Sequence, residues 1–277
     1  MPLKHLIQSP RLWPAHPEKD RRVTWMELFF DLIFVAAVAQ VGEPLVEDYT
    51  PAGLFRYAFL FVLIWWAWSG HTAYTTRFDH DDLPNRLLVL LQCFIAAIMA
   101  ANARDALDSR SSAGFGAAYA GMRIVLVAQY LRARSVEETR PLATRYAIGF
   151  GAAAVVWLLS ALLDPPGRYW LWALALAIDF ATPWLAAKHT LRFPPDASHF
   201  PERFGLFTII LLGGMFQALF GLMKLGALIK FAPHPVMAGF QNMAALLLFL
   251  VQLSNVLGYD QTSRSRTPSR TWIPQSR

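Results

Sequence analysis

The sequence lacks the features by which soluble enzymes and small secreted proteins are recognised. It has one cysteine, Cys93, inside an apolar block, which excludes a disulfide framework or a paired-cysteine metal site within the chain. It contains no nucleotide-binding glycine loop, no serine-hydrolase elbow, no zinc-protease helix motif and no dinucleotide fingerprint. We therefore expect no enzyme activity, no cofactor and no metal.

Charge is scarce as well. Only 16% of the 277 residues are charged and 55% are hydrophobic, with a mean hydropathy of +0.34. The apolar residues form blocks of about twenty, the length with which a helix crosses roughly 30 Å of hydrocarbon. The pattern predicts an all-α, polytopic transmembrane helix bundle of about seven to eight spans. We place them at about 25–42, 55–75, 86–103, 114–131, 146–163, 169–187, 204–222 and 236–257.

The net charge of +6 does not indicate nucleic-acid binding, because the basic residues lie in short connections and tails. They concentrate in the N-terminal tail and in alternate connections, which predicts that both termini are cytoplasmic and that the lipid bilayer is the main partner. The first twenty residues hold four prolines and no signal-peptide core, so no cleavage is expected. Small residues in the span at 114–131 allow close helix approach, within the chain or in a homo-oligomer.

Two acidic residues in the first span are the first functional candidates. Glu27 and Asp31 are four residues apart, so they share one helix face. Carboxylates inside a membrane are costly, and two on one face are typical of a proton or cation site. The alternative is that Glu27 interacts with the helix N-terminus while Asp31 pairs with a neighbouring helix. Both interpretations stay open from sequence.

A second pair of charges lies deeper in the apolar blocks. Arg123 and Asp179 fall near the middle of two spans that run in the same direction, so we expect a buried, structural ion pair. Asp31 is an alternative partner for Arg123, and an exchange between the two carboxylates would be a switch.

Residues 77–82, Arg-Phe-Asp-His-Asp-Asp, gather carboxylates and an imidazole beside the membrane. These oxygens suggest a divalent cation site, but the calcium-loop pattern is missing, and a solvated N-cap cluster for the next helix is favoured. For His71, at the end of the second span, an interfacial hydrogen-bonding role is favoured over a ligand role. Tryptophans near block ends, such as Trp68, are typical of the headgroup level.

Three ordered segments, residues 25–35, 77–82 and 199–210, resemble signature segments of the bacterial low temperature requirement protein A family. The surroundings of Arg123 and residues 177–183 are similar as well, and the resemblance runs from about residue 20 to 212. It implies a multi-pass protein of the bacterial inner membrane, named for a cold-growth phenotype, and gives no substrate. The family-like positions, for which it assigns no role, are Glu27, Asp31, Arg77, Asp79, Asp81, Asp82, Arg123, Asp179, His199, Glu202 and Arg203.

The chain departs from that family after Leu212. Residues 214–252 resemble an internal piece of the sulfate permease (SulP) anion-transporter family, about forty residues that cannot supply a site built from two inverted repeats. We therefore predict four parts and interpret the chain as a chimera joined at about residue 213. They are a cytoplasmic tail (1–22), a membrane domain (23–212), a sulfate-permease-like fragment (213–258) and a disordered basic tail (259–277).

The leading functional hypothesis is transport or ion conduction with Glu27 and Asp31 as protonatable groups. The alternative is a non-transporting scaffold or cold-stress factor that acts through partners or lipids. A remnant of a sulfate transporter, resting on residues 214–252 alone, is the third.

Overall fold

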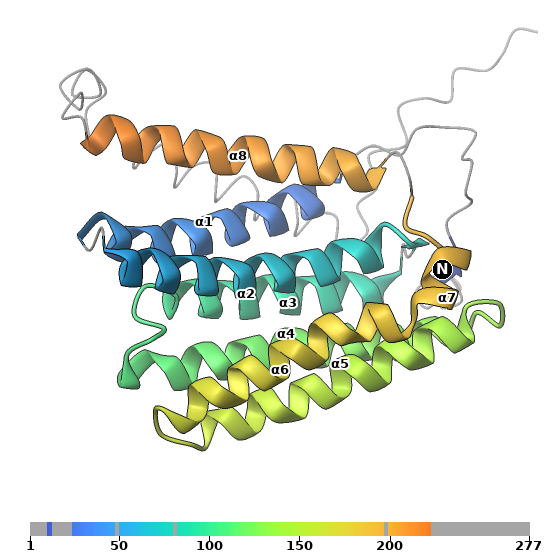
Figure 1. Cartoon of the computed structure of the whole chain (residues 1–277). Helices are drawn as coiled ribbons and strands as arrows, with labels where there is room; N and C mark the ends of the chain where they lie inside the picture. The colour runs from blue at the N-terminus through green and yellow to red at the C-terminus, as the bar shows by residue number, and fades with distance from the viewer. Residues whose placement is uncertain (1–9, 13–23, 48–49, 80–81, 197–198, 223–277) are drawn as a thin grey trace, which may run out of the picture. The chain divides into compact units, whose positions relative to one another are not determined.

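The helices of the protein follow the apolar blocks of its sequence. The computed structural model describes residues 10–12, 24–47, 50–79, 82–196 and 199–222, all within one compact unit, 1–231 (Figure 1). The described helices are α1 (Trp25–Glu47), α2 (Pro51–Thr75), α3 (Leu83–Ala101), α4 (Ser109–Ala133), α5 (Arg140–Ala161), α6 (Gly167–Leu185), α7 (Ala187–Arg192) and α8 (His199–Leu222). The predicted helical class is confirmed for this part of the chain.

One small element was not predicted. Strand β1 (Arg11–Leu12) pairs antiparallel with β2 (Phe78–Asp79), with Leu12 opposite Phe78. Two residues are too few to show the alternation of apolar and polar side chains by which a strand is recognised.

Among the described helices, five, α1 to α5, are long and apolar enough to cross a membrane. Helix α6 forms where a span is expected, but Arg168 and Asp179 lower its mean hydropathy, so its crossing stays a prediction. Whether α8 crosses the membrane also stays a prediction. The eighth expected span, 236–257, and the parts beyond residue 222 lie outside the described residues.

Large apolar side chains point outward from these helices, including Phe55, Leu162 and Trp184, which are 73%, 81% and 82% exposed. Such exposure suits a chain whose surrounding solvent is lipid. The interior is formed by fully buried aromatic side chains, among them Phe30, Trp68 and Trp172.

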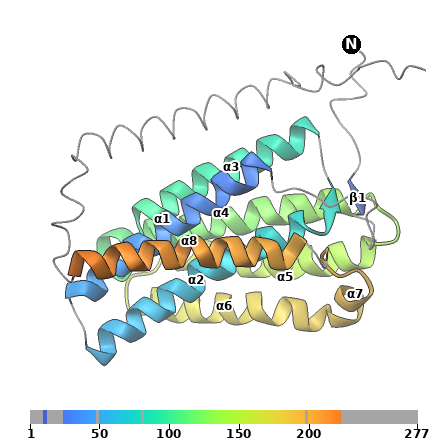
Figure 2. The same ribbon diagram turned by 90° about the horizontal axis from the view of Figure 1, so that it is seen from above.

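Short connections make the helices α1 to α6 alternate in direction, and α8 runs alongside α1 and α2 (Figures 1 and 2). One end of the helices, here called the basic end, therefore holds the start of α1, the end of α2 and the start of α8, along with the α4–α5 connection and α7. The basic residues of the basic end include Arg77, Arg132, Arg134, Arg140, Arg145, Lys188, Arg192 and Arg203. Its cytoplasmic location remains a prediction.

Candidate functional site

Helix α1 starts with a reciprocal cap formed by Thr24 and Glu27. The Glu27 carboxylate accepts hydrogen bonds from the backbone N of Thr24 (2.8 Å) and from its Oγ1 (3.0 Å), while the backbone N of Glu27 donates to Thr24 Oγ1 (3.3 Å). This is a capping box, which satisfies N–H groups that the first turn of a helix leaves unpaired. Glu27 thus has the helix-terminal contact that one of the two sequence interpretations predicted.

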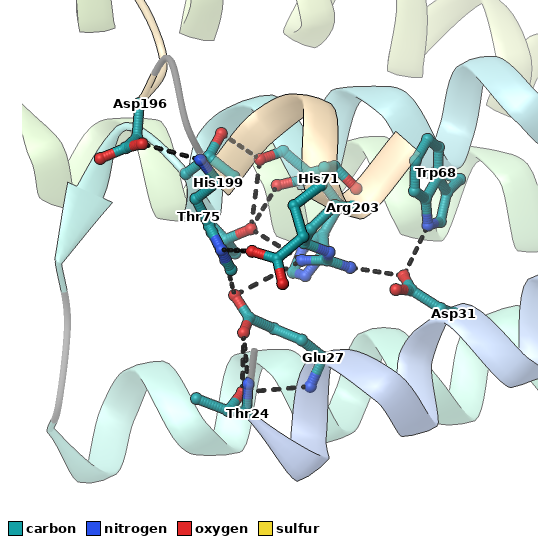
Figure 3. Close-up of polar contacts among 12 residues, drawn as sticks. Thr24, Glu27, Asp31, Trp68, His71, Thr75, Asp196, His199 and Arg203 are labelled. Atoms are coloured by element: carbon teal, nitrogen blue, oxygen red, sulfur yellow. Dashed lines mark hydrogen bonds and ion pairs between the residues drawn. The ribbon is translucent and has the colours of Figure 1, made fainter. Parts of the chain in front are cut away.

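Asp31 lies one turn further along α1 and is fully buried. Its Oδ1 accepts a hydrogen bond from Trp68 Nε1 of α2 (2.7 Å) and forms an ion pair with Nη2 of Arg203 of α8. The Nη1 of Arg203 lies 3.5 Å from Glu27 Oε1, so one guanidinium is shared by two carboxylates (Figure 3). Asp31 therefore pairs with Arg203, and the described contacts of Arg123 do not include it.

Two buried histidines flank this guanidinium. His199 Nε2 is 3.5 Å from Glu27 Oε1, and its Nδ1 is 3.4 Å from Glu202 Oε2. The ring of His71 packs on that of Phe30, with centroids 4.0 Å apart. His71 is 1% exposed because α1 and α8 cover the end of α2, and its expected depth at the membrane interface stays a prediction.

We call Glu27, Asp31, Trp68, His71, His199 and Arg203 the α1–α8 cluster. Several of its atoms are buried and have no hydrogen-bond partner among the described residues, namely Asp31 Oδ2, His71 Nδ1 and Arg203 Nε. The amide of the buried Gln92 of α3 makes no hydrogen bond of good geometry among the described residues, although it interacts with the His71 ring. Because buried polar atoms are rarely left without partners, such a concentration is more typical of a functional site than of a structural one.

Sequence reasoning missed part of this cluster. Trp68 was expected at the headgroup level, yet it is fully buried and donates to Asp31. A tryptophan near the end of an apolar block fits both positions, because one of its ends is apolar and the other polar. Gln92 is a polar residue within an apolar block, and this pattern was the sequence signal by which its place in the site could have been predicted.

The Arg123–Asp179 pair is the second polar site, and the expected pairing is confirmed. Arg123 Nε donates to Asp179 Oδ2 at 2.9 Å, and both side chains are buried. The Nη2 of Arg123 donates to the Tyr119 hydroxyl (2.8 Å), and the guanidinium lies 4.9 Å from the centroid of that ring. Gly70 of α2 provides the space, since a Cβ there would lie 2.8 Å from Arg123 Nη1.

At the α2–α3 connection, Asp82 caps α3 as predicted. Its Oδ1 accepts a hydrogen bond from Asn85 N (3.2 Å), and its Oδ2 lies 2.5 Å from Arg132 Nη2. The cap is buried, not solvated, because Asp82 is 2% exposed. Asp81 and the side chain of Asp79 lie outside the described residues. Within the described part of the chain, no three acidic, histidine or cysteine side chains are grouped to hold a metal ion.

Comparisons with known proteins give the family. The sequence profile described as Bacterial low temperature requirement A protein (LtrA) matches residues 22–264, and so continues past Leu212, where the resemblance read from motifs ended. An uncharacterized protein of Rhizobium meliloti is 30% identical over 214 residues, 73% of this chain and 51% of that protein. The chain thus spans about half the length of this relative.

Shorter likenesses connect the chain to anion transporters. The low affinity sulfate transporter 3 of Stylosanthes hamata is 41% identical over 64 residues, 23% of this chain and 10% of the transporter. The bicarbonate transporter BicA of Synechocystis is 38% identical over 52 residues, 19% of this chain and 9% of the transporter. No solved structure matches the chain. The profile match covers most of the sequence, and the chain belongs to the bacterial low temperature requirement A protein (LtrA) family as a membrane-spanning member.

Proposed function

We propose that this LtrA-family protein transports a proton or a small monovalent cation across the membrane, with Asp31 as the group that takes up the ion. The observation that carries the proposal is the position of Arg203, which contacts both Asp31 and Glu27. The Arg203 guanidinium has two similar pairings, one mainly with Asp31 and one mainly with Glu27. Binding of an ion to Asp31 selects between them.

The chemistry follows from charge. A proton or cation on Asp31 removes the attraction between Asp31 and Nη2 of Arg203, and the guanidinium then shifts its pairing toward Glu27, 3.5 Å from Nη1. Because the cluster is buried, these attractions are much stronger than they would be in water. The unpartnered Oδ2 of Asp31 offers a position for the incoming ion.

The shift of Arg203 acts on α8, which packs mainly against α1 and α2 among the described helices. The two contacts of Arg203 with α1 are polar and lie at the start of α8, and Trp68 and Phe207 stack one turn further on, with centroids 4.2 Å apart. Loss of the Asp31 contact therefore alters the attachment of α8 at one end. Alternating access requires an element with two positions, and α8 has one attachment to α1 for each pairing of Arg203.

Flux into proteoliposomes that contain the full chain tests the proposal. A pH-sensitive dye trapped inside reports protons, and tracer ions report Na⁺ and K⁺, under an imposed membrane potential. We expect flux by the wild type and loss to background in Asp31→Asn. The matched control is Asp164→Asn, an exposed carboxylate in the α5–α6 connection, which should keep wild-type flux.

Background flux of all three ions by the wild type would refute transport of this kind. Equal flux by the wild type and by Asp31→Asn, at equal reconstituted amounts, would remove Asp31 from the mechanism.

The alternative, a non-transporting scaffold, is favoured by the pairing of the buried charges Arg123 with Asp179 and Arg203 with Asp31, since static packing also requires partners. Cold growth separates the two functions. If Asp31→Asn restores growth of a deletion strain at normal abundance, the scaffold is favoured, and if it fails at normal abundance, a chemical role is favoured. Sulfate or bicarbonate transport is not proposed, because the likeness covers about a tenth of those transporters.

A further inference from the structure

Arg77 is a buried cation for which the described part of the chain provides no carboxylate partner. Its side chain is 2% exposed, and it follows the last turn of α2 at the basic end. Within the described residues it makes two hydrogen bonds, from Nε to the backbone oxygen of Phe193 (2.8 Å) and from Nη1 to the Tyr130 hydroxyl (3.4 Å). Neither acceptor carries a formal charge.

Two other buried arginines of the described helices, Arg123 and Arg203, show the contrast, while a further one, Arg168, donates to Ser160 O and Ser112 Oγ. Arg123 pairs with Asp179, and Arg203 pairs with Asp31. Removing a guanidinium from water costs several kcal/mol unless an opposite charge compensates it. The carbonyl ends of α2 and α7 supply about half a negative charge each at most, and this effect fades beyond the last turn. Arg77 therefore retains unused capacity for an anion.

The surroundings of Arg77 add further positive charge. Its guanidinium lies 5.6 Å from the centroid of the Tyr146 ring of α5, and the Tyr146 hydroxyl contacts Thr190 Oγ1 of α7 at 3.1 Å. Arg145 precedes Tyr146 in α5, and its Nη1 donates to Leu185 O (3.1 Å). Arg192 precedes Phe193, and its guanidinium packs on the Phe193 ring. Both arginines are exposed. Arg77 is thus a buried cation whose two contact residues, Tyr146 and Phe193, are each preceded in the chain by an exposed arginine.

We propose that Arg77, with Arg145 and Arg192, binds a phosphate group at the basic end of the protein. The phosphate belongs either to an anionic phospholipid headgroup or to a free phosphate, both of which present the same oxygens to a guanidinium. Basic pockets between transmembrane helices near the membrane surface are the usual form of such headgroup sites. This site is separate from the α1–α8 cluster, and it does not depend on ion transport.

The thermal stability of the full chain in neutral detergent tests the site. The melting temperature is measured with dihexanoyl phosphatidylglycerol, with dihexanoyl phosphatidylcholine, and with inorganic phosphate against chloride at equal ionic strength. We expect phosphatidylglycerol to raise the melting temperature relative to phosphatidylcholine. Arg77→Gln should abolish the rise, whereas Arg134→Gln, an exposed arginine of the same end, should keep it.

The results with the two ligands distinguish a lipid headgroup from a free phosphate. A rise with phosphatidylglycerol alone identifies a lipid headgroup, and a rise with inorganic phosphate as well identifies the phosphate group itself as the feature bound. No rise with either ligand overturns the proposal, as does an unchanged rise in Arg77→Gln.

If Arg77→Gln does not fold, native mass spectrometry of two proteins that keep Arg77 decides. The wild type should retain phosphatidylglycerol in preference to phosphatidylcholine. The exposed double variant Arg145→Gln, Arg192→Gln should bind about fivefold more weakly or worse, the effect of losing at least one surface cation. Equal retention of the two lipids by the wild type would also overturn the site.

Discussion

At the scale of single residues, Gly149 shows how closely α5 and α6 approach. A Cβ at this position would lie 2.2 Å from Thr182 Oγ1 and 2.6 Å from its Cγ2. We expect Gly149→Ala to destabilise the protein by about 1–3 kcal/mol, the usual effect of overpacking. The measurement is unfolding in a denaturing detergent. Gly205→Ala on α8, where no atom lies within 4 Å of the added Cβ, is the control and should keep or slightly raise the stability, because alanine favours the helix. Equal stabilities of the two variants would contradict the tight α5–α6 contact.

The Arg123–Asp179 pair gives a prediction at the same scale. Asp179→Asn leaves the guanidinium buried without its charge partner, which should cost about 3–5 kcal/mol in the same unfolding assay. Replacing both residues with apolar ones, Arg123→Met with Asp179→Leu, should cost much less, because no buried charge is then unpaired. A double variant as unstable as Asp179→Asn would show that the pair does more than compensate charge.

Sequence predicted one of the two buried arginine pairs and missed the other, for a physical reason. Arg123 and Asp179 each lie within an apolar block at matching depth, so each had one evident partner. Arg203 stands where the sequence is still polar, beside Glu202, and looks like a loop residue. Only the packing of α8 against α1 buries it beside Asp31, and such packing leaves no local signal in the sequence.

At the scale of the helix, α3 depends on Asp82 in two ways. Its Oδ1 caps the helix through Asn85 N, and its Oδ2 holds Arg132 of α4. Asp82→Asn should keep the cap and lose the charge pair, whereas Asp82→Ala should lose both, with the cap itself contributing about 1 kcal/mol. Hydrogen exchange of the first turn of α3 measures this difference. Equal exchange in the two variants would mean that the cap contributes nothing.

Helix boundaries could be predicted to within a few residues where apolar blocks end in turn residues. The span expected at 169–187 is α6, Gly167–Leu185, and the span at 55–75 ends with α2 at Thr75. The first span was expected to end at about residue 42, because Glu43 and Pro44 follow. Instead α1 continues to Glu47 with Pro44 inside it. Pro44 lacks the N–H that would bond to the carbonyl of residue 40, and the helix continues for only three residues beyond it.

For the whole molecule, alternation of basic and acidic connections predicts the orientation in the membrane. Cys93 is buried, and Cys93→Ala gives a cysteine-free background. We expect Asp164→Cys in that background to react with an impermeant maleimide in intact cells. Ser135→Cys, in the α4–α5 connection at the basic end, should react only after permeabilisation. The reverse labelling pattern would place the basic end outside.

The contact between Asp31 and Arg203 also constrains how the protein is made. The two residues are 172 positions apart, so a ribosome adding about 5–20 residues per second synthesises Asp31 roughly 9–35 s before its partner. The Arg123–Asp179 pair, 56 positions apart, is completed about three times sooner. Throughout that interval the first helix carries a carboxylate that the membrane interior does not accept. During that time the apolar residues of α1 have to offset a cost of about 2.5–3.5 kcal/mol for the unpaired carboxylate, unless it is protonated or shielded until α8 arrives.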